Sequence, residues 1–261
     1  MAEWPVPNAL VQAVRDRRAV LFAGAGISVG AIQASAGDLR EALARDIQKD
    51  FPGYDPSWRR FEDVADEYAA INGRIVLVNR IAALIPQNVS PLTSHLVAVK
   101  PFRFIVTTNW DLLFEAAYNQ VGQGKQILSS EADVPNFSWD QHNLIKIHGT
   151  VDHPLTLVAT TDDYESYPDT HPMMLDRMGD LFSNYTVLVV GHSLRDEHVR
   201  RLLSHIRRQR GEWAQKAYAV GYFDDVRSKL LATRKIETIN ASAEEFLPEL
   251  IRQAGTLPNE P

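Results

Sequence analysis

Two short polar segments carry the side chains best suited to chemistry, and each directly follows an apolar run. The first spans residues 107–111 and includes Asn109 and Asp111; the second spans residues 146–149 and includes His148. An imidazole can act as a general base near neutral pH, and amides and carboxylates can hold hydroxyl or amide groups of a substrate. The simpler alternatives are that Asn109 or Asp111 caps the following helix, and that a lone histidine before a glycine is structural. One cap does not explain the whole cluster at 107–111, so we expect a polar site there.

Two glycine-bearing segments also follow apolar runs. They are Gly24-Ala25-Gly26-Ile27-Ser28 and Gly191-His192-Ser193-Leu194. Glycines allow the backbone to approach a phosphate, and the start of a following helix favours an anion. A tight turn from strand to helix is the alternative for the first segment. Ser193 could also be a nucleophile, but Arg195 stands where the elbow motif of hydrolases has its second glycine.

Short apolar runs alternate with amphipathic segments along most of the chain, which is typical of buried strands and surface helices. We expect strands at 18–23, 102–107, 144–147, 186–190, 217–220 and 235–239, with a further short strand at 155–159. We expect helices at 7–17, 37–50, 112–121, 173–182, 196–208, 226–233 and 243–253. This alternation predicts an α/β fold with a doubly wound, Rossmann-like parallel sheet of about six strands. Ligands of such sheets bind at the carboxyl ends of the strands.

Residues 51–99 have a different sequence pattern from the rest of the chain. Prolines punctuate this stretch, and apolar residues recur at helical spacing between them. We therefore expect an all-helical insertion, a cap subregion at about 51–99, within a single domain spanning residues 1–261.

The composition is that of an ordinary globular protein. Of the 261 residues, 45% are hydrophobic and 23% are charged, which excludes a disordered chain. The net charge of −6 argues against a protein that coats nucleic acid. With no cysteine, neither a disulfide nor a thiolate zinc site can form. No apolar run approaches the ~20 residues that span a bilayer, and the start lacks a signal-peptide pattern, so we expect a cytoplasmic protein without membrane contact.

Two further features have plain structural explanations. Asp152 and His153 are neighbours, but nothing completes a metal-ligand set, so we expect a solvated loop and no metal. The arginines at Arg200-Arg201, Arg207-Arg208 and Arg210 could face a partner or a nucleic acid, but their charge pattern favours a solvated helix face. We therefore expect no direct nucleic-acid binding.

Taken together, in this order and at these spacings, the motifs resemble the sirtuin superfamily. Residues 24–28 resemble its glycine-rich NAD loop, and Gly37-Asp38-Leu39-Arg40 resembles a degraded Pro-Asp-Phe-Arg element. Residues 108–111 are similar to the Gln-Asn-Ile-Asp element of deacylases, and closer to the Thr-Thr-Asn-Tyr-Asp form of bacterial sirtuin-like NADases. His148-Gly149 matches the catalytic His-Gly, and Gly191-His192-Ser193 resembles the Gly-x-Ser segment that contacts the nucleotide.

The resemblance covers roughly residues 17–250 and departs from the deacylase pattern. Deacylases usually carry a four-cysteine zinc module, which a cysteine-free chain lacks, and Gly37 and Leu39 replace the family's proline and phenylalanine. The resemblance therefore implies an NAD+ glycohydrolase of the antiphage-defence type, which cleaves the nicotinamide–ribose bond and depletes NAD+. The alternatives are a non-catalytic NAD or ADP-ribose sensor or regulatory subunit, an NAD-dependent deacylase or ADP-ribosyltransferase, and another doubly wound enzyme.

The resemblance also implies residue roles. Asn109 would hold the ribose hydroxyls and position water, and His148 would be the base. Asp111 and the backbone of Trp110 would bind the nicotinamide carboxamide. For Arg40, a surface salt bridge is an equal alternative to a contact with the cofactor. The implied NAD+ contacts are Gly24, Ala25, Gly26, Ser28, Asp38, Arg40, Thr108, Trp110, Gly191 and Ser193, of which residues 24–28 would cradle the diphosphate.

Partners are also implied by the resemblance. NAD+ would be the substrate, with no metal involved. The protein would form homo-oligomers, act with a separate sensor such as an ATPase or a nucleic-acid-guided protein, or do both.

Overall fold

A parallel sheet of seven strands forms the centre of the computed structural model, which describes residues 5–32, 34–192, 194, 199–200 and 217–255. The strands are β1 (Ala19–Ala23), β2 (Phe104–Thr107), β3 (Gln126–Leu128), β4 (Asn143–Lys146), β5 (Thr186–Val190), β6 (Ala217–Gly221) and β7 (Ile236–Asn240). They lie in the order β3-β4-β2-β1-β5-β6-β7, and every neighbouring pair is parallel. The predicted doubly wound, Rossmann-like sheet is confirmed, with one strand more than expected.

The additional strand is β3, at one edge of the sheet. It is only three residues long, and of these only Leu128 is buried, whereas Ile127 is exposed. An edge strand with one buried residue leaves no apolar run in the sequence, which is why the sequence did not predict it.

Two other predicted elements have a different outcome, the strand at 155–159 and the helix at 196–208. The strand predicted at 155–159 is wrong: Pro154–Thr156 forms a single 3₁₀ turn, and Leu157 and Ala159 then pack among helices. Val158, between them, packs in the second core of the sheet, and Leu155 is exposed, so the apolar residues of this segment divide between two cores and solvent. Most of the predicted helix at 196–208 lies outside the described residues.

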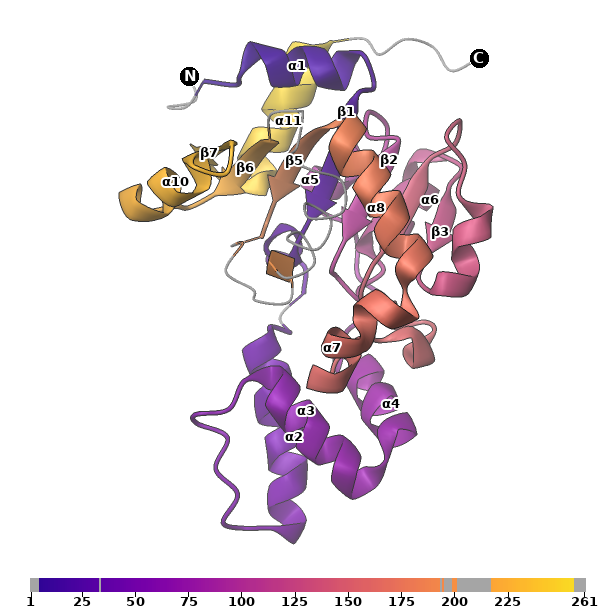
Figure 1. Cartoon of the computed structure of the whole chain (residues 1–261), viewed down its shortest axis with the longest axis vertical. Helices are drawn as coiled ribbons and strands as arrows, with labels where there is room; N and C mark the ends of the chain where they lie inside the picture. Colours follow the sequence, from indigo (N-terminus) through magenta and orange to yellow (C-terminus); the bar gives the residue numbers. More distant parts are fainter. Residues whose placement is uncertain (1–4, 33, 193, 195–198, 201–216, 256–261) are drawn as a thin grey trace.

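Helices cover both faces of the sheet (Figure 1). Strand side chains alternate between the two faces, with Leu21 facing one core and Phe22 the other. The first core packs against α1 (Asn8–Arg15), α5 (Thr93–Ala98), α6 (Leu113–Val121) and α11 (Ala243–Ala254). The second packs against α7 (Thr161–Thr170), α8 (Pro172–Asn184) and α10 (Asp225–Ala232).

A separate helical lobe lies at the carboxyl ends of the strands (Figure 1). It consists of α2 (Ala36–Asp50), α3 (Phe61–Asn72) and α4 (Arg74–Leu84), which share one apolar core. The lobe includes α2, which precedes residue 51, whereas α5 packs back against α6 and α11. Trp110 and Val151 from the sheet loops also join its core, so the lobe is anchored on the segments predicted to carry the site.

Candidate active site

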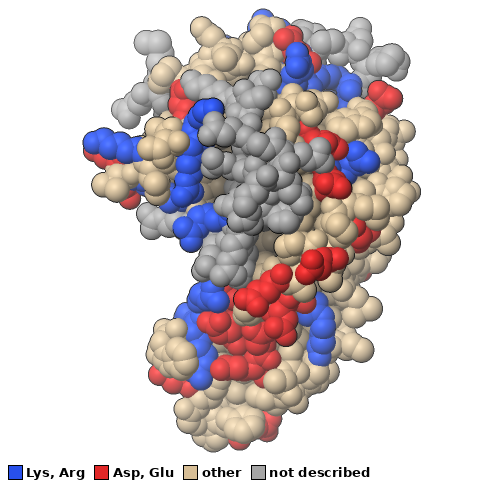
Figure 2. Space-filling view, viewed as in Figure 1, with Lys and Arg blue, Asp and Glu red and all other residues tan. Residues whose placement is uncertain are grey.

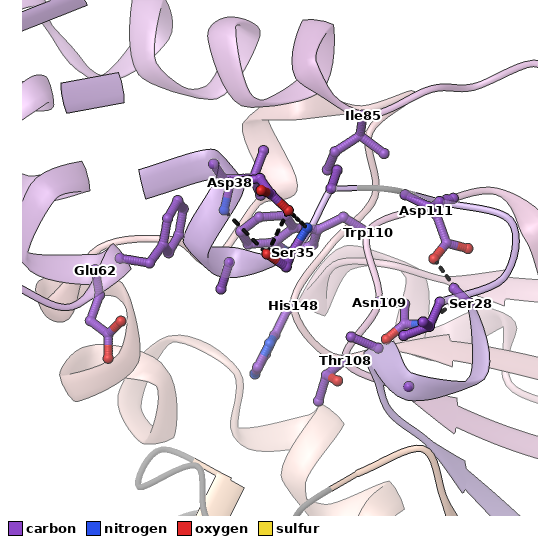
Figure 3. A pocket seen from close by; sticks show the side chains of 18 of the residues that line it. Ser28, Ser35, Asp38, Glu62, Ile85, Thr108, Asn109, Trp110, Asp111 and His148 are labelled. Atoms are coloured by element: carbon purple, nitrogen blue, oxygen red, sulfur yellow. Dashed lines mark hydrogen bonds between the residues drawn. The ribbon is translucent and has the colours of Figure 1, made fainter. Parts of the chain in front are cut away.

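The loops after β1, β2 and β4 open into a cavity of about 500 Å³, whose far side is formed by the helical lobe and α7 (Figure 3). The structure brings many of the predicted site residues to this cavity: Ala25, Gly26, Ser28, Asp38, Thr108, Asn109, Trp110, Asp111 and His148. Gly24, Arg40 and Gly191 are not among the lining residues, and Ser193 lies outside the described part of the chain.

Asn109 presents an unpaired acceptor at the wall of this cavity. The residue is 7% exposed, and its Nδ2 donates hydrogen bonds to the Gly24 carbonyl and to Ser28 Oγ. Its Oδ1 has no hydrogen-bond partner among the described residues. An unpaired buried acceptor is costly, so a hydroxyl donor from a ligand would stabilise it. Trp110, next in the chain, likewise has a buried Nε1 donor without a described partner.

Asp111 holds two loops together. Its Oδ2 accepts a hydrogen bond from Ser28 Oγ at 3.0 Å, and its Oδ1 accepts one from the Leu113 amide at 3.0 Å. The second bond binds the first amide of α6, whose N-cap position is Leu112, so of Asn109 and Asp111 it is Asp111 that contacts the helix start. Each carboxylate oxygen keeps a second lone pair for a further donor.

A second histidine, His95 at the start of α5, lies behind this network. Its Nε2 is 3.5 Å from Ser28 Oγ, and the side chain is fully buried. Burial lowers the pKa of His95 to about 4, against the opposing pull of the Asp111 and Glu244 carboxylates. The ring is therefore neutral near pH 7. No sequence pattern pointed to this residue, because α5 meets the glycine loop only in the folded chain.

His148 reaches the cavity from the loop after β4. It is 7% exposed, and its ring meets that of Tyr164 edge-on, with 5.2 Å between centroids. Gly149 adopts a positive φ of 80°, and a Cβ there would lie 2.1 Å from the Thr156 carbonyl oxygen. Only glycine allows this turn without strain or collision, which explains why a glycine follows His148.

The glycines near β1 and β5 pack against each other. The Gly24 amide donates to the Val190 carbonyl at 2.9 Å, and the Gly26 amide to the Gly191 carbonyl at 2.8 Å. A Cβ at Gly26 would lie 2.7 Å from the Gly191 carbonyl oxygen. The amides of Gly24 and Gly26 are therefore engaged within the protein, and the expected diphosphate cradle stays a prediction. These two glycines serve close contact between the loops.

The Gly37-Asp38-Leu39-Arg40 element divides into a capping residue and a surface residue. Asp38 accepts hydrogen bonds from the Ser35 amide and hydroxyl, which lower the pKa of its carboxyl and cap α2 at the cavity wall. Arg40 instead donates to Glu41 and to the Arg59 carbonyl. The ion pair with Glu41 is the salt bridge expected as one explanation for Arg40, and the cofactor contact stays a prediction.

The cavity is acidic. Its lining includes the carboxylates of Asp38, Glu62 and Asp111 and, among the described residues, no lysine or arginine. Figure 2 shows further acidic side chains gathered on the helical lobe. Such a cavity favours a cationic group and disfavours a phosphate. Glu62 of the lobe and Tyr164 of α7 could not be assigned from sequence, because no motif links them to the strand ends.

The described residues include neither a metal-binding cluster nor a membrane-spanning helix. No three His, Asp or Glu side chains lie close enough together there to hold a metal ion. Asp152 and His153 form only a pair, with 3.6 Å between Oδ1 and Nδ1. None of the helices described has both the length and the apolar character to cross a bilayer.

The part of the chain that carries most of these strands and loops matches a known protein family. Residues 103–239, slightly more than half of the chain, match the SIR2-like domain. The chain belongs to the SIR2-like family. The matched part contains β2 to β6 and all but the last residue of β7, and therefore both polar loops, which carry Asn109 and His148.

Curated relatives of this SIR2-like chain are longer proteins. It is 28% identical over 197 residues to the NAD(+) hydrolase ThsA of Bacillus cereus (strain MSX-D12), covering 74% of this chain and 41% of that protein. It is 26% identical over 219 residues to ThsA of Cytobacillus dafuensis, covering 80% and 42%. Defense-associated sirtuin 2 of Bacillus subtilis is 25% identical over 134 residues, covering 50% of this chain and 13% of that protein. The chain thus spans less than half the length of each of these relatives.

A solved sirtuin structure, described as the basis for sirtuin substrate affinity, is 16% identical. The superposition covers 95% of this chain and 98% of the sirtuin chain, with a TM-score of 0.46. This likeness is too weak to add to the family assignment.

Proposed function

We propose that this SIR2-like chain hydrolyses the nicotinamide–ribose bond of NAD+ and releases nicotinamide and ADP-ribose. The observation that carries the proposal is the pair of Asn109, with its unpaired buried Oδ1, and His148 at the wall of one cavity. The curated names of the ThsA relatives, NAD(+) hydrolase, support the same reaction.

The chemistry of NAD+ fits the charge of the cavity. Nicotinamide is cationic in NAD+ and leaves as a neutral molecule, while positive charge develops on the ribose. The carboxylates of Asp38, Glu62 and Asp111 favour both the cationic nicotinamide ring and the positive charge that develops on the ribose. With no lysine or arginine in the described lining, we place the nicotinamide and its ribose here and the diphosphate outside.

Two side chains act on the reacting end. Asn109 Oδ1 accepts a hydrogen bond from a ribose hydroxyl or from the attacking water, and this holds the reactants in position. His148 takes a proton from the water or a ribose hydroxyl as the C–N bond breaks and the new C–O bond forms. The bonding electrons leave with nicotinamide, so no metal or redox partner is needed to balance the step.

The carboxamide of nicotinamide needs both a donor and an acceptor. Asp111 has a lone pair free on each oxygen, and the Trp110 indole offers a donor without a described partner. We assign these two residues to the carboxamide. The wall also includes Thr108, Ala25, Gly26 and Ser28.

The biological role that we propose is based on the names of the relatives. We infer a cytoplasmic effector that depletes NAD+ in defence against phage, regulated by self-association or by a separate sensor protein. The printed name of Defense-associated sirtuin 2 supports this role.

Chromatography of the products after incubation of the purified chain with NAD+ tests the proposal. We expect equal amounts of nicotinamide and ADP-ribose. Binding of NAD+ without nicotinamide release would instead indicate a sensor. Nicotinamide release that depends on an added acetylated peptide would indicate a deacylase.

A further inference from the structure

A lysine lies fully buried between the two polar loops. Lys146, the last residue of β4, is 1% exposed, although lysines are rarely buried unless their donors are paired. Its Nζ lies 2.6 Å from the Asp111 carbonyl and 3.4 Å from the Trp110 carbonyl. The same Nζ lies 2.7 Å from Glu115 Oε1 and 2.9 Å from Thr150 Oγ1.

Three of these partners, Trp110, Asp111 and Thr150, belong to the two loops that reach the cavity. The two carbonyls directly follow Asn109, and Thr150 comes two residues after His148. A backbone bond from the Val151 amide to the Trp110 carbonyl, 3.0 Å long, joins the same loops. Lys146 does not line the cavity, so it holds the loops from behind.

Glu115 balances the charge of Lys146 from α6. Its side chain is 12% exposed, and burial raises the pKa of its carboxyl while Lys146 lowers it. The carboxylate neutralises the ammonium but belongs to neither polar loop. The ammonium is therefore the side-chain group that contacts both loops, alongside the backbone bond between Val151 and Trp110.

We propose that Lys146 is a positioning residue for NAD+ cleavage, whose ammonium fixes the Asn109 loop to the His148 loop. This inference rests on the proposed function. An apolar side chain of similar length would fill the space but could not hold the carbonyls and Thr150 together. A misplacement of about 1 Å between reacting groups can lower a rate ~100-fold.

The first test compares the double variant Lys146→Met/Glu115→Gln with Glu115→Gln alone. The double variant leaves no unpaired buried charge, and the single variant keeps the ammonium on both loops. For nicotinamide release, we expect the double variant to lose about 10- to 100-fold in kcat with KM changed less than about threefold. Glu115→Gln should retain kcat within about threefold. Equal kcat in the folded double variant and its control would overturn the proposal.

A second test restores the ammonium and does not depend on the stability of the double variant. Because the chain has no cysteine, Lys146→Cys creates a unique thiol that can be alkylated in denaturant before refolding. Bromoethylamine rebuilds an ammonium side chain of nearly lysine length, and 1-bromopropane builds an uncharged chain with the same number of heavy atoms. We expect only the ammonium adduct to recover kcat to within about threefold of wild type refolded in the same way. Equal recovery with both adducts would overturn the proposal.

Hydrogen exchange separates this inference from the proposed function. Wild-type protein that releases no nicotinamide would defeat the proposed function but leave the link between the loops measurable. The double variant should then exchange faster than Glu115→Gln in residues 107–116 and 146–153, with β1 unchanged. Equal exchange in these loops would show that Lys146 does not position them.

Discussion

Ser28 Oγ donates a hydrogen bond to Asp111 Oδ2 at 3.0 Å and accepts one from Asn109 Nδ2 at 3.0 Å. A hydroxyl can donate and accept at once, so one serine ties the loop after β1 to the loop after β2. Because Asn109 Nδ2 is engaged in this way, its Oδ1 is the amide atom left for a ligand. The orientation of the proposed catalytic amide is therefore set by a residue on another loop.

We predict that Ser28→Ala lowers both stability and activity. The change leaves buried groups of Asn109 and Asp111 with one partner fewer, which costs roughly 1–3 kcal/mol, and frees the amide to turn. NAD+ turnover should fall about tenfold or more. Urea unfolding and nicotinamide release measure the two effects.

Ser242→Ala is the matched control, because this serine caps α11 and does not line the cavity. It should cost about 1 kcal/mol of unfolding free energy with turnover unchanged. If Ser28→Ala affected stability alone, as the control does, the serine would have no part in orienting Asn109.

Gly26→Ala should destabilise the fold in the absence of any nucleotide. Its Cβ would lie 2.7 Å from the Gly191 carbonyl oxygen, and backbone cannot yield as a side chain does. We expect a loss of about 1–3 kcal/mol in the unfolding free energy, measured with the ligand-free protein.

Gly37→Ala is the comparison, since its Cβ would lie 3.5 Å from Ser35 Oγ, an ordinary contact, within α2. It should be neutral or stabilise by up to about 1 kcal/mol. Normal stability of Gly26→Ala combined with weaker NAD+ binding would instead favour the diphosphate cradle over loop packing.

His95 should make the protein less stable as the pH falls below about 6.5. The unfolded chain takes up a proton near the ordinary histidine pKa, whereas the buried ring resists protonation until about pH 4. The unfolded state therefore binds more protons between these values, and stability falls by up to about 1.4 kcal/mol per pH unit. Denaturant unfolding from pH 7.5 to 4.5 measures this slope.

The contribution of His95 is isolated by comparing His95→Gln with His153→Gln. The first removes the buried ring and should flatten the slope, while the second removes a side chain that is 72% exposed and should leave the slope as in wild type. An unchanged slope in His95→Gln would assign the acid sensitivity to other groups.

The sheet and the two polar loops were predictable because their signals are local. β1 consists of five buried apolar residues, and Asn109 and His148 stand immediately beyond strands. Parallel strands bring their carboxyl ends to one edge, so the meeting of these residues at one cavity follows from topology.

Other parts depended on contacts that no local pattern encodes. β3 buries one residue, and α7 contains Pro168 and buries only Tyr167, so neither has an apolar repeat. The partner of Gly26 is the backbone of Gly191, far away in sequence. The roles of His95 and Lys146 likewise depend on elements that meet only after folding.

Turnover of Asn109→Ala and His148→Ala, measured beside their affinity for NAD+ by calorimetry, tests the central claim most directly. We predict that each variant stays folded and binds NAD+, while nicotinamide release falls ~10²–10⁴-fold relative to wild type. Release at the wild-type rate by both variants would contradict the claim that these two side chains carry out the cleavage.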